Sequence, residues 1–309
     1  MGNIVAVDIG GTHLRTALFS PNKVEPLAIQ RSSTHVQGEV VFERLCSAIA
    51  LVWGKDPVVA ISVASAGPLD PEAGMILSAP NIPGWENFPL ANQLSSHFKV
   101  PVFLGNDANL AALGEWRYGA GQGHDNILYL TISTGIGGGI INKGQLLLGH
   151  RGLAAELGHV TVLPDGPICS CGQKGHLEAI SSGPSIARYV SEKIAEGTSS
   201  ILSNKTTISA RDIANAARNG DNLSQEAFAR AGEYLGFALA DFLHIFNPSI
   251  VILGGGVSQS GELLIKPARA ALEDRVMNSN YTKDLCITQA NLGDDAGLIG
   301  ALVQAQLNL

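Results

Sequence analysis

Short apolar runs alternate with amphipathic stretches along most of this chain. Residues 4–10, 58–64 and 101–104 are apolar runs with the length of buried strands. Residues 40–53 carry apolar positions at helical spacing, and 107–117 are also expected to be helical. Further strands are predicted at 14–20 and 24–31, and a further helix at 90–98. Strands that alternate with helices in this way predict an α/β fold with a mainly parallel or mixed sheet.

A second cycle of the same kind begins at Ile127. Residues 127–133 predict a strand, 134–139 a glycine-rich turn and 139–142 a returning strand. This repeats the order of the first hairpin, and the weak internal repeat suggests two related lobes that each offer one glycine hairpin to a shared cleft. With short hinges near Gly119 and Ala296, we expect a small α/β lobe formed by 1–118 plus 296–309 and a large α/β lobe formed by 119–295.

The second half of the chain is mostly helical before its last strand. Residues 184–247 favour helices, including a long amphipathic one at 225–246 that stops at an Asn-Pro pair. Residues 250–253 predict a strand that runs into three glycines, and 298–306 predict a C-terminal helix.

Composition and charge narrow the functional class. The chain has 309 residues, of which 45% are hydrophobic and only 15% charged, so it can bury a large core. A net charge of −7 without any block of Lys or Arg argues against a nucleic-acid-binding surface. The first residues lack the pattern of a signal peptide, and no apolar stretch approaches the roughly 18 residues of a membrane span. We therefore expect a cytoplasmic protein that binds neither nucleic acid nor membranes.

Three glycine-rich turns are candidates for phosphate binding. The turns lie at 8–15, 134–139 and 254–257, each at the end of a predicted strand. Glycines let backbone amides approach phosphate oxygens, and a carboxylate at the strand end can orient hydrated Mg²⁺. Each turn taken alone is also compatible with an ordinary hairpin or strand–helix connection. The candidate ATP-binding residues are Asp8, Gly10, Gly11, Thr12, Thr134, Gly135, Gly255 and Gly256.

The segment Gly105-Asn106-Asp107 lies between a predicted strand and a predicted helix. Asp107 would stand at the helix N-terminus, where the helix dipole favours an ionised carboxylate. Such a carboxylate can accept the proton of an attacking hydroxyl in phosphoryl transfer. From the local sequence alone, Asn106 or Asp107 could equally be a helix N-cap.

The four cysteines do not form a disulfide framework in a chain of this length. Cys46 and Cys286 stand singly in apolar surroundings and are interpreted as core thiols. Tetrahedral Zn²⁺ needs four soft or borderline ligands. His159, Cys169, Cys171 and His176 supply them within 18 positions, and a site with only protein ligands would be structural. The alternative is that His176 is an exposed loop histidine beside a three-ligand or absent site.

Taken together, the three turns resemble those of the actin-like ATPase (ribonuclease H-like) fold. Over nearly its whole length the chain resembles the ROK family of sugar kinases and repressors, and within it the bacterial glucokinases. This resemblance implies ATP- and Mg²⁺-dependent phosphorylation of a hexose, with glucose as the first expectation and Asp107 as the catalytic base. N-acetylglucosamine, N-acetylmannosamine and fructose kinases share the motifs and stay open. The resemblance also implies a homodimer or homotetramer.

The resemblance further implies which residues hold the sugar. Residues 81–85, Asn-Ile-Pro-Gly-Trp, match the family's sugar loop, and 156–159, Glu-Leu-Gly-His, match its E-x-G-H motif. The implied sugar-binding residues are Gly67, Asn81, Asn106, Asp107, Glu156, His159 and Glu178. The family's cysteine motif, C-x-C-G-x-x-G-C, has His176 here in place of its third cysteine.

Two other functional classes were weighed against the kinase. The family's repressors carry a winged helix-turn-helix ahead of the first glycine hairpin, and only three residues precede Ile4 here, so we expect no such domain. An ATP-driven conformational or filament protein of the same fold would have no use for the E-x-G-H and zinc elements. The sequence therefore favours the kinase, in which closure of the two lobes would exclude water.

Overall fold

The computed structural model describes residues 2–79 and 81–309. Contacts along the chain divide it into two compact units. The first unit holds Met1–Asp125, Gly139–Ala155 and Asn291–Leu309, and the second holds Asn126–Gly138 and Glu156–Ala290. Residues 119–125, 139–155 and 291–295, which the predicted large lobe includes, thus belong to the first compact unit; the lobe boundaries themselves stay a prediction.

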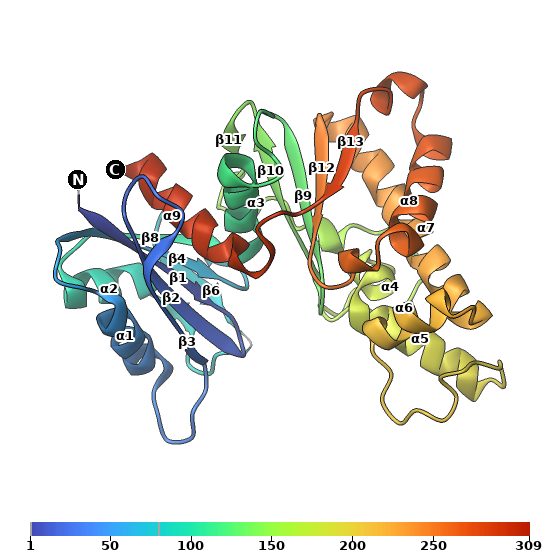
Figure 1. Ribbon diagram of the computed structural model, residues 1–309, viewed down its shortest axis with the longest axis horizontal. Helices are drawn as coiled ribbons and strands as arrows, with labels where there is room; N and C mark the ends of the chain where they lie inside the picture. Colours follow the sequence, from blue (N-terminus) through green and yellow to red (C-terminus); the bar gives the residue numbers. More distant parts are fainter. Residues whose placement is uncertain (1, 80) are drawn as a thin grey trace. The chain divides into compact units, whose positions relative to one another are not determined.

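The first unit is built on a five-stranded sheet with the order β3-β2-β1-β4-β8 (Figure 1). Its strands are β1 (Asn3–Ile9), β2 (His13–Phe19), β3 (Pro26–Ser33), β4 (Val58–Ser65) and β8 (Val102–Asn106). β1 runs parallel to β4 and β4 parallel to β8, whereas the β1–β2 and β2–β3 pairs are antiparallel hairpins. The mixed sheet predicted for an α/β fold is therefore confirmed.

Helices cover this sheet because its central strands, β1 and β4, are apolar and buried along most of their length. Val5, Val7 and Ile9 of β1 join one buried cluster with α1 (Val41–Val52) and α2 (Leu90–Phe98). α9 (Ala296–Asn308) packs against β1 and β4, and α3 (Asp107–Tyr118) packs closely against α9. Asp8 thus alternates with the residues that face α1 and α2, and we find it beside the start of α9.

A small antiparallel sheet, β5-β6-β7, is a feature of the first unit that the sequence did not predict. It consists of β5 (Leu69–Asp70), β6 (Met75–Ser78) and β7 (Glu86–Phe88). The loop between β6 and β7 carries Asn81, so this sheet frames the predicted sugar loop. Trp85 and Phe88 stack with ring centroids 4.9 Å apart, which anchors the far end of that loop.

The second sheet has the order β11-β10-β9-β12-β13. Its strands are β9 (Ile127–Ile132), β10 (Ile136–Asn142), β11 (Gln145–Leu146), β12 (Ile250–Gly254) and β13 (Cys286–Gln289). β12 is parallel to both β9 and β13. β10 starts at Ile136, three residues earlier than predicted, so four of the six residues of the predicted glycine turn are strand.

Helices make up most of the rest of the second unit. They are α4 (Glu178–Ser181), α5 (Gly183–Ala195), α6 (Ala210–Arg218), α7 (Asn222–Phe246) and α8 (Glu262–Arg275). α7 begins at an N-cap, Asp221, which accepts a hydrogen bond from the Ser224 N–H, and it ends where Asn247 takes a left-handed conformation. None of the described helices has both the length and the apolar character needed to cross a membrane.

The two single cysteines have different surroundings. Cys46 lies in the core on α1, as predicted, and burial followed by the charge of Glu43 raises the pKa of its thiol to about 11. The prediction for Cys286 is wrong, because its side chain is exposed. It lies on β13, the edge strand of the second sheet, where one neighbour is missing and burial is incomplete.

Candidate active site

In the first unit, the carboxyl ends of three parallel strands lie in register. Ile9 of β1 is paired with Ser65 of β4, and Ser65 is paired with Asn106 of β8. The residues that follow these three positions therefore emerge at one edge of the sheet. They include the predicted site residues Gly10, Gly67 and Asp107. In open α/β sheets this edge is where ligands bind.

Asn106 and Asp107 take different positions at the start of α3. The Asn106 side-chain oxygen accepts hydrogen bonds from the backbone N–H groups of Ala108, at 3.0 Å, and Asn109, at 3.2 Å, so Asn106 is the N-cap of α3. Asp107 is the first helical residue, and its Oδ1 accepts the Ala108 N–H at 2.8 Å. Because the cap is already supplied by Asn106, the Asp107 carboxylate is not required for that purpose.

The first glycine turn joins β1 to β2. Asp8 and Arg15 face each other across this hairpin and form an ion pair, and the Arg15 guanidinium also lies 3.6 Å from the carboxylate of Asp295. The turn is closed by a hydrogen bond from the Gly10 N–H to the His13 carbonyl at 2.9 Å. Thr34 donates its backbone N–H to the Thr12 carbonyl at 2.9 Å, which fixes the turn to the end of β3.

Gly11 and Gly67 bring this turn and the sugar loop together. A Cβ atom at Gly11 would lie 2.6 Å from the Cβ of Asn81, so the glycine allows the close approach of the two loops. Gly67 has a φ of +92°, and a Cβ there would lie 2.6 Å from the Ser78 carbonyl oxygen. The Asn81 carbonyl oxygen is 2.7 Å from Nε2 of His35.

The second unit repeats the arrangement of strand ends. Thr131 near the end of β9 is paired with Gly254 at the end of β12, so Thr134 and the glycines after β12 emerge at the same edge. Gly255 has a φ of +82° and approaches the Ile132 carbonyl too closely for a side chain. Beyond this edge lies a cavity of about 640 Å³. Its lining includes Thr134, Gly256, Arg188, Ser209 and Arg211.

Glu178 connects the second glycine turn to the cysteine loop. Its Oε2 accepts the Ile136 N–H at 2.9 Å, and a Cβ at Gly135 would lie 2.6 Å from that same oxygen. Its Oε1 accepts the Ser170 hydroxyl at 2.6 Å and lies 3.4 Å from the Cys169 sulfur. Burial raises the pKa of the Glu178 carboxyl, but the bonds from Ser170, Ile136 and Cys169 outweigh burial and lower its pKa overall.

The E-x-G-H segment packs against the same turn. Glu156 precedes a short 3₁₀ turn, Leu157–His159, and its carbonyl accepts the His159 N–H at 3.0 Å. Gly158 lies against the Ile136 carbonyl, where a Cβ would clash. The motif therefore needs glycine at its third position so that His159 can reach the cysteine loop.

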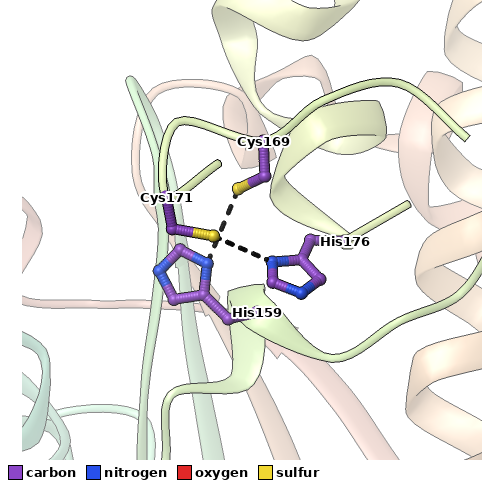
Figure 2. A group of neighbouring side chains, drawn as sticks. All are labelled: His159, Cys169, Cys171 and His176. Carbon is purple, nitrogen blue, oxygen red and sulfur yellow. Dashed lines mark hydrogen bonds between the residues drawn. The ribbon is translucent and has the colours of Figure 1, made fainter. Parts of the chain in front are cut away.

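The two histidines and two cysteines converge as the sequence predicted (Figure 2). One ligand atom from each of His159, Cys169, Cys171 and His176 can be chosen so that all four lie within 4.8 Å of one another. Nδ1 of His159 is 3.6 Å from the Cys169 sulfur, and Nδ1 of His176 is 3.3 Å from the Cys171 sulfur. Ideal Zn–S and Zn–N bonds in a tetrahedron separate sulfur and nitrogen by about 3.5 Å. The four donors thus have a spacing that fits a zinc ion.

The chemistry of the donors also fits a cation. Burial raises the pKa of the Cys169 thiol, so a thiolate there needs a positive partner, which Zn²⁺ would supply. Burial and the neighbouring His159 lower the pKa of His176, which favours the neutral imidazole that binds metals. His176 is 9% exposed, which argues against the alternative of an exposed loop histidine.

Each unit thus gathers its own share of the predicted residues. The first unit brings together the Asp8–Thr12 turn, Gly67, Asn81, Asn106 and Asp107, and the second brings together Thr134, Gly135, Glu156, His159 and Glu178 with the cysteine loop. Sequence reasoning missed Arg15, whose pairing with Asp8 follows from the hairpin register, and Asp295. It also missed Arg188 and Arg211 at the cavity, for which the sequence carries no local signal.

Comparison with known proteins identifies the family. The ROK family model matches residues 4–307. The glucokinase of Thermotoga maritima is 38% identical over 303 residues, which are 96% of this chain and 95% of that protein. A ROK family glucokinase from Streptomyces griseus, solved in complex with glucose and AMPPNP, has a TM-score of 0.81 and 35% identity and covers 97% of this chain and 98% of its own. The ROK hexokinase from Thermus thermophilus has a TM-score of 0.82 and 35% identity, covering 99% and 98%.

These solved kinases have the actin-like ATPase fold, so the fold predicted from the three turns is confirmed. The matches extend over both compact units and include every predicted site residue. The chain belongs to the ROK family.

Proposed function

We propose that this chain is an ATP-dependent hexokinase that phosphorylates glucose to glucose 6-phosphate. The observation that carries this proposal is the position of Asp107 directly after β8, at the same sheet edge as the Gly10–Thr12 turn and Gly67. A carboxylate beside a phosphate-binding turn is what transfer to a hydroxyl requires. Full-length similarity to glucokinases supports glucose as the acceptor.

Asp107 would accept the proton of the attacking sugar hydroxyl. Its place at the N-terminus of α3 favours the ionised carboxylate, and Asn106 holds that end of the helix in place. Asn81 and Gly67 in the first unit, and Glu156, His159 and Glu178 in the second, would bind sugar hydroxyls. These groups combine hydrogen-bond donors and acceptors, as a neutral polar ring requires.

The backbone of the two glycine turns would hold the phosphates of ATP. Asp8 would orient the water shell of the Mg²⁺ that arrives with ATP, and that ion supplies charge neutralisation at the β- and γ-oxygens. The cavity of about 640 Å³ beside Thr134 and Gly256 has the size of a small-ligand site and would take the nucleoside part of the donor. Arg188 and Arg211 at its wall can attract the negatively charged nucleotide.

A structural zinc ion in a Cys₂His₂ site would fix the cysteine loop. Cys169 and Ser170 contact Glu178, and Glu178 contacts the turn at Ile136, so the ion would hold the sugar-side groups of the second unit in place. All four ligand positions would be filled by the protein, which would leave no open position for catalysis.

The enzyme is expected to work in the cytoplasm as a homodimer or homotetramer, without nucleic acid or membrane partners. The acidic balance of −7 and the lack of a membrane-spanning helix in the described residues are consistent with this setting. Other hexoses, namely N-acetylglucosamine, N-acetylmannosamine and fructose, share the required chemistry and are alternatives for the acceptor.

A coupled ADP-release assay across a hexose panel tests the proposal, with ATP and polyphosphate compared as donors. We expect ATP-dependent turnover with glucose above all other sugars. Asp107→Asn should lower kcat by about 10²- to 10⁴-fold while glucose binding stays measurable by titration, since a general base acts mainly in the transition state. No turnover with any hexose would refute the enzyme assignment, and an Asp107→Asn variant with more than about a tenth of wild-type kcat would place the base elsewhere.

A further inference from the structure

Glu115 on α3 is a fully buried carboxylate to which the proposed reaction assigns no role. Its side chain is 0% exposed, and within residues 2–79 and 81–309 no cation pairs with it. Three backbone N–H groups bind the carboxylate in place of a cation. Oε2 accepts from Ala120 at 2.8 Å and from Asn291 at 3.1 Å, and Oε1 accepts from Leu292 at 2.8 Å. Burial of a charge is unfavourable unless such bonds are complete, so each of the three bonds matters.

The three N–H groups belong to two segments that are distant in sequence. Ala120 follows the end of α3, and the backbone carbonyl of Glu115 itself accepts the N–H groups of Gly119 and Gly121. Asn291 and Leu292 lie more than 170 residues later, where the chain returns to the first unit. Gly119 approaches the Glu115 carboxylate so closely that a side chain there would clash with it. One carboxylate therefore holds both segments to α3.

The residues that follow 291–292 contact the β1–β2 hairpin, which carries the first glycine turn. Asp295, three residues beyond Leu292, lies 3.6 Å from the Arg15 guanidinium, and Arg15 pairs with Asp8. Gly297 packs against Asp8, because a Cβ there would lie 2.8 Å from Asp8 Oδ2. A displacement of residues 291–297 would therefore reach the carboxylate that is expected to orient Mg²⁺.

The helix that carries Glu115 also carries the candidate base, Asp107. Asp107 and Glu115 lie on one helix, eight residues apart, which is about 12 Å at 1.5 Å per residue. The start of α9 rests tightly on this helix, since a Cβ at Gly114 would lie 2.8 Å from the Ala296 carbonyl oxygen. α3 thus carries the base at its first turn and the anchor for the donor-side segment at its third.

We propose that Glu115 is a positioning residue for phosphoryl transfer. Its buried carboxylate fixes residues 291–297, and with them Asp8 and Arg15, to the helix that begins at Asp107. This role rests on the proposed kinase activity. In-line transfer depends on the separation of attacking group and phosphate, and a misplacement of about 1 Å lowers rates by about 10²-fold. A purely structural carboxylate would instead affect stability alone.

Glu115→Gln tests this role with almost no change of shape. The glutamine amide has only one oxygen, so its NH₂ group must face at least one of the three N–H groups that now donate to the carboxylate. Two donors then face each other, so either Ala120 or residues 291–292 must shift. We expect kcat for glucose phosphorylation to fall 10- to 100-fold by the geometric argument above. The Kd for glucose, titrated without nucleotide, should stay within about threefold of the wild-type value, because the substitution affects the transition state and not the binding of the sugar.

Asp221→Asn is the matched control in the second unit. Asp221 is 7% exposed, and its carboxylate accepts bonds from the Ile201 N–H and from the Ser224 N–H and hydroxyl. It has no role in the proposed reaction and is not among the residues that line the cavity, so its loss should lower Tm while kcat per folded molecule stays within about twofold of wild type.

Gly297→Ala tests the same link if Glu115→Gln does not fold. The three atoms nearest to the new methyl group all belong to the Asp8 side chain, so the variant should fold, lower kcat and raise the Mg²⁺ concentration needed for half-maximal activity. The proposal is overturned if Glu115→Gln keeps more than half of wild-type kcat, if it loses only as much as Asp221→Asn, or if Gly297→Ala matches wild type in kcat and Mg²⁺ dependence. Failure of the kinase assignment is seen separately, as an inactive wild-type enzyme.

Discussion

Replacing Gly11 by Ala is the sharpest test of how the first glycine turn works. From the sequence alone this glycine is expected to admit phosphate, so that a side chain there should weaken ATP binding far more than sugar binding. The structure shows a nearer neighbour. A Cβ at Gly11 would lie 2.6 Å from the Asn81 Cβ and 3.1 Å from its Cγ, whereas ordinary contacts begin at 3.4 Å. Asn81 must therefore move by roughly 1 Å, and the sugar loop with it.

The size of the effect follows from overpacking. Forcing a methyl group into a packed site typically costs about 1–3 kcal/mol. The sugar loop resists the shift, because the Asn81 carbonyl oxygen is held at 2.7 Å from His35 Nε2 and the far end of the loop is anchored by the stacked Trp85. If this free energy is taken from sugar binding, the Kd for glucose rises about 5- to 160-fold.

Titration calorimetry with glucose, in the absence of nucleotide, measures this directly. Gly10→Ala is the matched control, because the nearest atom to a Cβ at Gly10 is the His13 carbonyl oxygen at 3.8 Å. It should leave the glucose Kd unchanged and weaken a non-hydrolysable ATP analogue instead, if phosphate approaches the turn at that residue. A folded Gly11→Ala variant with wild-type glucose affinity would refute the packing argument.

Three further predictions concern the metal, the thiols and the assembly. The purified protein should contain one zinc per chain after a chelator wash. His176→Ala should weaken zinc binding and lower Tm. Elemental analysis that finds no zinc under reducing conditions would contradict the Cys₂His₂ site. With zinc bound, a thiol reagent should modify only Cys286, which is exposed. Cys169 and Cys171 should become reactive when zinc is removed. Cys46 should stay unmodified in both states, because burial raises the pKa of its thiol to about 11. Light scattering should give at least twice the 32.2 kDa chain mass, and a monomer alone at assay concentrations would refute the assembly.

Local sequence patterns were sufficient for most elements of the fold. Long helices such as α7 and buried strands such as β4 have strong periodicity or strong apolar runs, and their predicted bounds lie within three residues of the observed ones. The convergence of the two cysteines and two histidines was predictable for a different reason. Cysteine and histidine side chains in one short segment are constrained to lie close together by the chain itself, and a zinc site needs little more than that.

Features that depend on contacts distant in sequence could not be predicted. The β5–β7 sheet consists of strands of two to four residues, too short to show a period. The exposure of Cys286 depends on which strand lies at the sheet edge. Two of the three partners of Glu115 are backbone groups more than 170 residues away, which no side-chain pattern marks. Each of these features is determined by contacts between segments that are distant in sequence.

At each of the two glycine turns, a residue predicted to bind phosphate lies in close contact with a residue predicted to bind sugar. In the first unit Gly11 approaches Asn81, and in the second Gly135 approaches Glu178. Both glycines belong to predicted phosphate turns, and both neighbours are predicted sugar residues. A shift of either turn on binding phosphate would therefore move a sugar-binding group directly, without any intervening element. Since coupling between two ligands is reciprocal in free energy, glucose should in turn alter the affinity for ATP. One such contact thus lies in each compact unit.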